Sequence, residues 1–172
     1  MSTARVVATV GPNGRSQIAV GHEVAPVYRF GGDRSGVDPH DLEGMGASQD
    51  LTAAAEGEVV VADLWRAERS NPTGADAALN PEGFDVECPP GGSRWRVVEF
   101  GANLHRPLHA TRTLDYGVIL SGEITLLLED GSVLLEAGAT TVLPGVVHGW
   151  RTGPRSCRMA LVQIAMDPIQ GS

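Results

Sequence analysis

Residues 109–150 contain two groups of side chains that are suited to metal or acid–base chemistry. The first group is His109, Thr111 and Asp115, and the second is centred on His148. Imidazole nitrogens and carboxylate oxygens are common ligands of catalytic zinc, and two histidines with one carboxylate suit Fe(II). The same groups transfer protons in general acid–base catalysis. Such chemistry requires a fold that brings the two groups together.

The segment between the two groups is expected to fold back on itself. Alternating apolar residues at 124–128 and 133–135 flank Asp130-Gly131, a dipeptide typical of a type I′ β-hairpin because both residues tolerate positive φ. In an extended strand, His109 and Thr111 project to the same face. The sequence therefore predicts a hairpin that carries the second group toward the first.

The first group resembles the first of two short motifs found in the cupins, a superfamily of small jelly-roll β-barrels that hold a metal between these motifs. The cupin pattern is His-x-His-x3-Glu-x6-Gly, and the same spacing here gives His109, Thr111, Asp115 and Gly122. The spacing matches the cupin pattern. Thr111 and Asp115 stand where the pattern has its second histidine and its glutamate, so two of the three ligand types differ.

The second group is similar to the second cupin motif, Gly-x5-Pro-x-Gly-x2-His-x3-Asn. Gly138 and Pro144 fit this spacing, whereas Gly145 and His148 each come one residue early and the final Asn is absent. The resemblance covers roughly the last 80 residues well. It implies an all-β, cupin-type jelly-roll β-barrel with N-terminal strands and covering loops.

The resemblance also implies that His109, Asp115 and His148 converge as metal ligands and catalytic residues. The expected cofactor is a divalent metal ion, with zinc or iron first and nickel or manganese also suited. Asp115 is shorter than the glutamate of the motif, so it is either a third ligand or a general acid or base. The alternative is structural: each histidine serves only as a hydrogen-bonded residue, and Asp115 pairs with an arginine such as Arg112.

Four residues are candidates for substrate binding: Thr111, Tyr116, Trp150 and His105. Trp150 shares strand parity with His148, and large aromatic side chains with a polar tip are common in pockets. Tyr116 adjoins Asp115. His105 precedes His109 by four residues, and it can replace the histidine that is missing at Thr111 only if the chain bends at Pro107. Alternatively, the two aromatic residues belong to the hydrophobic core, and His105 lies on the surface.

Strand signals are dense from residue 93 onward, so residues 93–172 are expected to form the barrel core. Residues 1–92 are expected to add strands and a loop-rich segment that packs on the barrel, within a single domain overall. A hairpin is predicted at residues 5–10 and 17–20 and a strand at 58–65, because these segments are apolar and bounded by turn residues. Segments 31–46 and 71–92 are rich in Gly, Pro and Asp and are predicted to be loops.

Composition excludes several other classes of function. The net charge of −8 and the absence of a basic segment argue against nucleic-acid binding. All 13 basic residues are arginines, so no lysine is present to form a Schiff base. No apolar run approaches membrane-spanning length, and two cysteines do not make a disulfide framework. We expect a cytoplasmic protein that binds a small-molecule substrate and forms a homodimer to cover its sheet edges.

Three functions fit these residues. The first is a metal-dependent, non-oxidative lyase, dehydratase, cyclase or isomerase that acts on a carbonyl- or hydroxyl-bearing metabolite. The second is an Fe(II)-dependent dioxygenase that uses the same residues. The third is a non-catalytic cupin that binds a small ligand. The metal content of the purified protein distinguishes them best.

Overall fold

The computed structural model describes residues 3–31, 52–68 and 88–166, and these residues form twelve strands and no helix. The all-β prediction is therefore confirmed. The strands are β1 (Ala4–Val10), β2 (Ser16–Val24), β3 (Val27–Gly31), β4 (Glu58–Ala67), β5 (Ser93–Phe100), β6 (His105–His109), β7 (Thr113–Ser121), β8 (Glu123–Leu128), β9 (Gly131–Glu136), β10 (Thr140–Pro144), β11 (His148–Arg151) and β12 (Cys157–Ala165).

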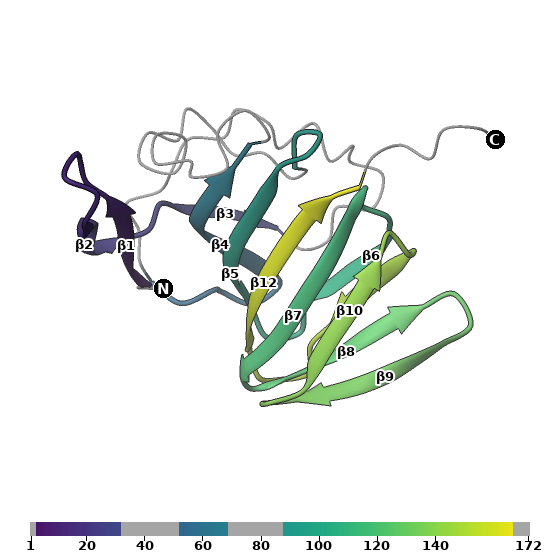
Figure 1. Ribbon diagram of the computed structural model, residues 1–172. Coiled ribbons are helices and arrows are strands. Elements are labelled where there is room, and N and C mark those ends of the chain that lie inside the picture. Colours follow the sequence, from purple (N-terminus) through teal and green to yellow (C-terminus); the bar gives the residue numbers. More distant parts are fainter. Residues whose placement is uncertain (1–2, 32–51, 69–87, 167–172) are drawn as a thin grey trace, which may run out of the picture.

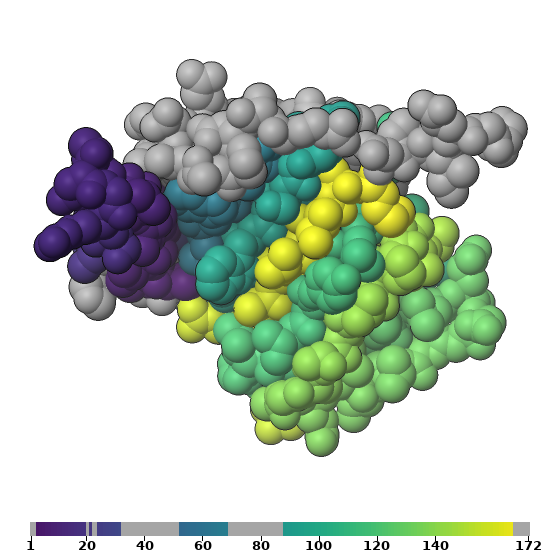
Figure 2. Space-filling model, viewed as in Figure 1, coloured from purple at the N-terminus to yellow at the C-terminus, as the bar shows by residue number. Residues whose placement is uncertain are grey.

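The strands pair in three antiparallel sheets (Figure 1). A six-stranded sheet has the order β10-β7-β12-β5-β4-β3, and a four-stranded sheet has the order β6-β11-β8-β9. The hairpin of β1 and β2 forms a separate two-stranded sheet at one end of the molecule, beside β3 and β4, as Figure 2 shows. No helix in the described residues is long and apolar enough to cross a membrane.

The six-stranded sheet begins before the boundary that the sequence suggested at residue 93. Both β3 and β4 belong to it, and β4 pairs with β5 along nearly its whole length. The reason is that β4 is buried on both faces, with Val59 and Val61 in the main core and Val60 and Ala62 in a second apolar cluster. The predicted loop at 31–46 lies outside the described residues except for Gly31, which ends β3, and most of 71–92 lies outside them too.

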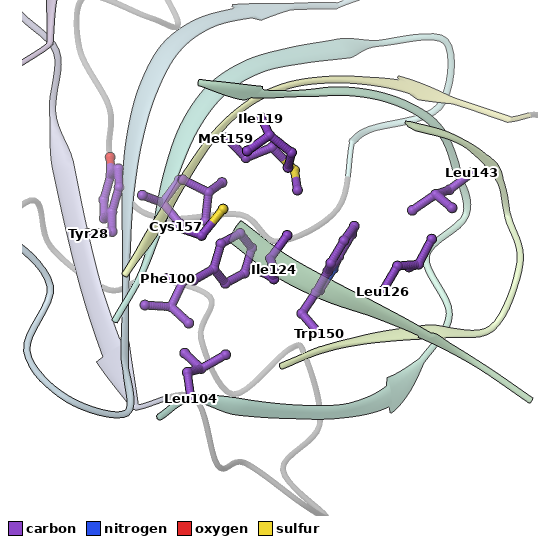
Figure 3. Packing of buried hydrophobic residues seen from close by; sticks show 13 residues of the cluster. Tyr28, Phe100, Leu104, Ile119, Ile124, Leu126, Leu143, Trp150, Cys157 and Met159 are labelled. Atoms are coloured by element: carbon purple, nitrogen blue, oxygen red, sulfur yellow. The ribbon is translucent and has the colours of Figure 1, made fainter. Parts of the chain in front are cut away.

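The main core fills the space between the two larger sheets (Figure 3). Alternation in β8 places Ile124 and Leu126 in it, as a half-buried strand requires. Phe100 of β5 and Trp150 of β11 meet there across the two sheets, with ring centroids 6.0 Å apart. Toward one side, this core gives way to a cavity that contains the polar groups described below.

The hairpin between the two motifs is confirmed, but its predicted turn is wrong. Leu128 pairs with Gly131, so the two turn residues are Glu129 and Asp130, and Gly131 already belongs to β9. Glu129, Asp130 and Gly131 all have a negative φ. A type I′ turn requires a positive φ at both central positions, so this turn is of another type. The alternation on either side determines the pairing, and the turn adapts to it.

Gly122, the glycine of the first motif, occupies a position that only glycine tolerates. Its φ is +75°, and an added Cβ would collide with the backbone oxygen of Ser156. Gly122→Ala is therefore expected to lower the free energy of unfolding by about 2 kcal/mol or more, from backbone strain and this clash. Chemical denaturation measures the loss.

Gly131→Ala is the matched control for this prediction. Gly131 has no positive φ, and an added Cβ would meet no atom within 4 Å. Its free energy of unfolding is expected to stay within about 0.5 kcal/mol of the wild type. Equal losses in the two variants would show that the backbone conformation at Gly122 is not the cause.

Cys88 and Cys157 both carry free thiols. Burial raises the pKa of each thiol to about 11, so neither is a reactive thiolate at neutral pH.

The homodimer stays a prediction, because the structure describes a single chain.

Candidate metal and substrate site

His109 and His148 lie directly opposite each other on two paired strands. His109 ends β6, His148 begins β11, and the two residues are cross-strand partners. Their ring centroids are 4.7 Å apart, and His148 also meets the edge of Trp150 at 5.7 Å. His148 and Trp150 are buried and His109 is half-buried. The two motifs therefore converge, and both contribute a histidine to the same place.

The two imidazole rings are held in the same way. Nδ1 of His109 is 2.9 Å from the carbonyl oxygen of Pro107, and Nδ1 of His148 is 2.9 Å from that of Val146. A carbonyl oxygen only accepts hydrogen bonds, so each Nδ1 carries the proton and donates it. In the neutral rings, Nε2 then keeps its lone pair, which is the arrangement of metal-binding histidines.

Burial keeps His109 in the form that a metal requires. It lowers the pKa of His109 to about 4, although the hydrogen bond to Pro107 acts in the opposite direction. The positive charge of Arg106 nearby lowers the pKa further. His109 is therefore neutral at pH 7, with a lone pair available on Nε2.

Asp115 lies in the same cavity, but on the opposite sheet from the histidines. It belongs to β7, where it pairs with Leu143 of β10 and Gln163 of β12. Burial raises the pKa of its carboxyl group, and the hydrogen bond from Gln163 and the nearby charge of Arg96 offset only part of this effect. Its Oδ1 is buried and has no hydrogen-bond partner among the described residues. A buried carboxyl oxygen without a partner costs free energy, so this position needs an explanation.

The cavity has a volume of about 110 Å³ and is mostly apolar. It is smaller than the roughly 150 Å³ of an apolar cavity that encloses benzene, but it is open to solvent on one side. Its polar lining consists of Arg96, Arg106, His109, Thr111, Asp115, His148 and Gln163, and its apolar lining of Phe30, Val59, Val61, Val98, Phe100, Leu143, Trp150, Met159 and Leu161.

Five of the seven residues predicted for the site line this cavity: His109, Thr111, Asp115, His148 and Trp150. Within the described part of the chain, no group of three or more His, Cys, Asp or Glu side chains is close enough together to hold a metal ion. The histidines thus form a ready pair, and Asp115 as a third ligand stays a prediction.

Tyr116 and His105 do not line this cavity. Tyr116 follows Asp115 in a regular strand, so its side chain projects to the outer face of the sheet, where it is 45% exposed. His105 is exposed and pairs with Arg151. The pairing of β6 with β11 shifts register between His148 and Trp150. Both Arg106 and His109 line the cavity although they are three residues apart, so side chains along β6 do not alternate regularly between its two faces.

Three polar residues of the cavity were not predicted: Arg96, Arg106 and Gln163. Gln163 shares a strand face with Cys157 and Met159. A polar residue in an otherwise apolar, inward-facing row is the signal that identifies its position.

Comparison with known proteins supports the same fold. The chain is 38% identical over 84 residues to phomopsin biosynthesis cluster protein C′ of Diaporthe leptostromiformis, which covers 47% of this chain and 44% of that protein. It is 32% identical over 83 residues to the cupin-domain-containing oxidoreductase virC of Hypocrea virens, which covers 45% and 43%. The matched region thus spans less than half the length of these curated relatives. No protein-family model matches the chain.

Among solved structures, a putative ethanolamine utilization protein Q from Salmonella typhimurium is 15% identical, with a TM-score of 0.50 over 97% of this chain and 99% of that chain. That likeness concerns the fold alone. Together, the antiparallel barrel and the paired histidines of two motifs define a cupin-type protein. The cupin resemblance of the sequence is thus confirmed by its similarity, over part of its length, to proteins named cupin-domain-containing oxidoreductases.

Proposed function

We propose that this chain is a metal-dependent small-molecule enzyme of the cupin type. It acts as a lyase, dehydratase, cyclase or isomerase on a carbonyl- or hydroxyl-bearing metabolite. The observation that carries this proposal is the histidine pair, in which both Nδ1 atoms donate to backbone carbonyls and both Nε2 atoms are left as lone-pair donors within one cavity. This donor set fits zinc or Fe(II), with nickel and manganese as further candidates.

The other ligand or acid–base group of the site is Asp115. Its orphaned Oδ1 is either a third ligand or the atom that gives and takes a proton. The raised pKa of Asp115 favours the second role, because burial shifts it toward the pH range in which general acids and bases work. A divalent metal bound at the histidines would polarise an oxygen atom of the substrate.

The rest of the cavity orients the substrate. Apolar side chains from both sheets surround the polar groups, and this low-polarity setting strengthens each electrostatic interaction with a substrate oxygen. Thr111 adds a neutral hydroxyl at the motif position next to His109, and it accepts a hydrogen bond from Thr113 at 2.9 Å. Trp150 braces the ring of His148 from the side.

A second candidate is an Fe(II)-dependent dioxygenase. The observation that favours it is the name of the relative from Hypocrea virens, a cupin-domain-containing oxidoreductase. The histidine pair and Asp115 suit Fe(II) as well as zinc.

Metal analysis combined with oxygen uptake distinguishes these functions. The protein, purified without chelators, is expected to contain zinc or nickel and to consume no dioxygen with a panel of small carbonyl- and hydroxyl-bearing metabolites. Iron together with dioxygen consumption would favour the dioxygenase. A protein that contains no metal, and that binds none of these ions when they are added, would overturn the metal-dependent proposal and leave a ligand-binding cupin.

A further inference from the structure

A chain of buried hydrogen bonds leads from Asp115 into the protein. Gln163 of β12 donates from Nε2 to Oδ2 of Asp115 at 3.2 Å. The amide oxygen of Gln163, Oε1, accepts a hydrogen bond from Nη1 of Arg96 at 2.8 Å. All three side chains are buried, with exposures of 3% for Asp115, 5% for Gln163 and 4% for Arg96. The contact at Asp115 is therefore part of a fixed network.

Arg96 is itself anchored at its far side. Its Nε donates to Oδ1 of Asp63 at 2.9 Å, and Arg66 donates to Oδ2 of the same carboxylate at 2.9 Å. Burial alone would raise the pKa of Asp63, but the charges and hydrogen bonds of Arg96 and Arg66 outweigh it and hold the pKa below its usual value. Asp63 is therefore charged, and it fixes the guanidinium plane of Arg96.

This anchoring determines which way the Gln163 amide points. A guanidinium group has donors only, so the atom of Gln163 that faces Arg96 must be its oxygen. The amide nitrogen then faces Asp115 and can only donate to it. Oδ2 of Asp115 is thereby used as an acceptor, and Oδ1 is the carboxyl oxygen that remains for other chemistry.

We propose that Gln163 is a positioning residue, which holds Asp115 against β12 through Oδ2, on the opposite side of the cavity from the histidine pair. Asp115 then presents Oδ1 to the substrate and is a proton carrier, while the histidines hold the metal. This inference rests on the proposed function of the site. It resolves the choice between ligand and acid–base roles for Asp115 in favour of the second.

The first test uses Co²⁺ as the probe, because its visible absorption reports the number and type of its ligands. Gln163→Leu removes the bond that retains Asp115, so the carboxylate is expected to join the metal. The absorption spectrum of the bound Co²⁺ should change, and Co²⁺ binding should tighten by about 10-fold, the scale on which residues around a metal alter affinity. Gln163→Glu, which still accepts from Arg96 but no longer donates, should act in the same direction.

Two controls make this result specific. Adding Asp115→Asn to Gln163→Leu should restore the wild-type spectrum, because the new ligand is lost. Gln17→Leu, the same substitution at an exposed glutamine of β2, should leave the spectrum unchanged. A purely structural role for Gln163 would lower stability without altering the spectrum, and an unchanged spectrum in Gln163→Leu with bound Co²⁺ would overturn the proposal while the metal site stands.

The second test needs no metal. In the ¹⁵N-labelled, metal-free protein, the side-chain amide protons of Gln163 should exchange with water far more slowly than those of Gln17. This protection should be lost in Arg96→Met, which keeps an unbranched side chain but has no donor. If wild-type Gln163 exchanges as fast as Gln17, the network does not exist and the proposal fails, whatever the metal does. A wild-type protein that binds no Co²⁺ while Gln163 stays protected would instead refute the proposed function and keep the hydrogen-bond network.

Discussion

Replacing His109 or His148 with alanine is expected to weaken Zn²⁺ or Co²⁺ binding by about 100-fold or more, beyond the 10–100-fold typical of residues that only support a ligand. Each substitution removes one of the two nitrogen donors whose Nε2 atoms are left free by hydrogen bonds at Nδ1. Isothermal titration calorimetry of each variant measures the change. The double variant is expected to show no specific binding.

His105→Ala is the matched control, since it makes the same substitution at an exposed histidine of the same strand. Its metal affinity should equal that of the wild type. If His105→Ala weakens binding as much as His109→Ala does, the metal does not sit at the histidine pair. Wild-type affinity in both His109→Ala and His148→Ala would remove the proposed site altogether.

Asp115→Asn separates the two roles of this carboxyl group in the same assay. If Asp115 is a ligand, Asp115→Asn should lower both metal occupancy and activity. If Asp115 is a proton carrier held by Gln163, Asp115→Asn should leave metal binding unchanged and abolish turnover. The network described above predicts the second result.

The largest effect on stability is expected at Asp63, which lies between two buried arginines. Its side chain is 2% exposed, and its carboxylate bonds to Arg96 at 2.9 Å and to Arg66 at 2.8 Å. Asp63→Asn removes the negative charge that compensates both cations in the interior. We expect the free energy of unfolding to fall by about 3–5 kcal/mol, the usual result of removing one partner from a buried ion pair. Denaturation in urea at pH 7 measures this loss.

An exposed ion pair provides the comparison. Glu123 lies 3.1 Å from Arg155, and the arginine side chain is 72% exposed. Glu123→Gln should therefore cost no more than about 1 kcal/mol, because water screens the pair. A loss at Asp63 as small as that at Glu123 would show that the buried network contributes little to stability.

Sequence pattern predicted the strands, and the resemblance to the cupins supplied the barrel and the expected convergence of His109, Asp115 and His148. Strict alternation of apolar residues predicted the β8 and β9 hairpin. Local pattern contains the strand assignment because a strand has a side-chain period of two. The turn type was not predictable in the same way, since strand pairing determined it rather than the Asp130-Gly131 dipeptide.

The rest of the site depends on pairing between strands far apart in the chain. The irregular pairing of β6 with β11 places Arg106 in the cavity and His105 outside it, and no local pattern shows that irregularity. Gln163 acquires its role only because β12 pairs with β7, which brings it next to Asp115. Periodicity identifies which face of a strand such residues occupy, but not which distant residue they meet.

The central claim is that His109 and His148 hold one divalent metal ion through Nε2. Crystals of the protein loaded with Zn²⁺ or Co²⁺, measured at the absorption edge of the metal, test it most directly. The claim predicts one strong anomalous peak at roughly 2.0–2.2 Å from Nε2 of both histidines. No peak between the two rings, or a metal bound only elsewhere on the chain, would contradict it.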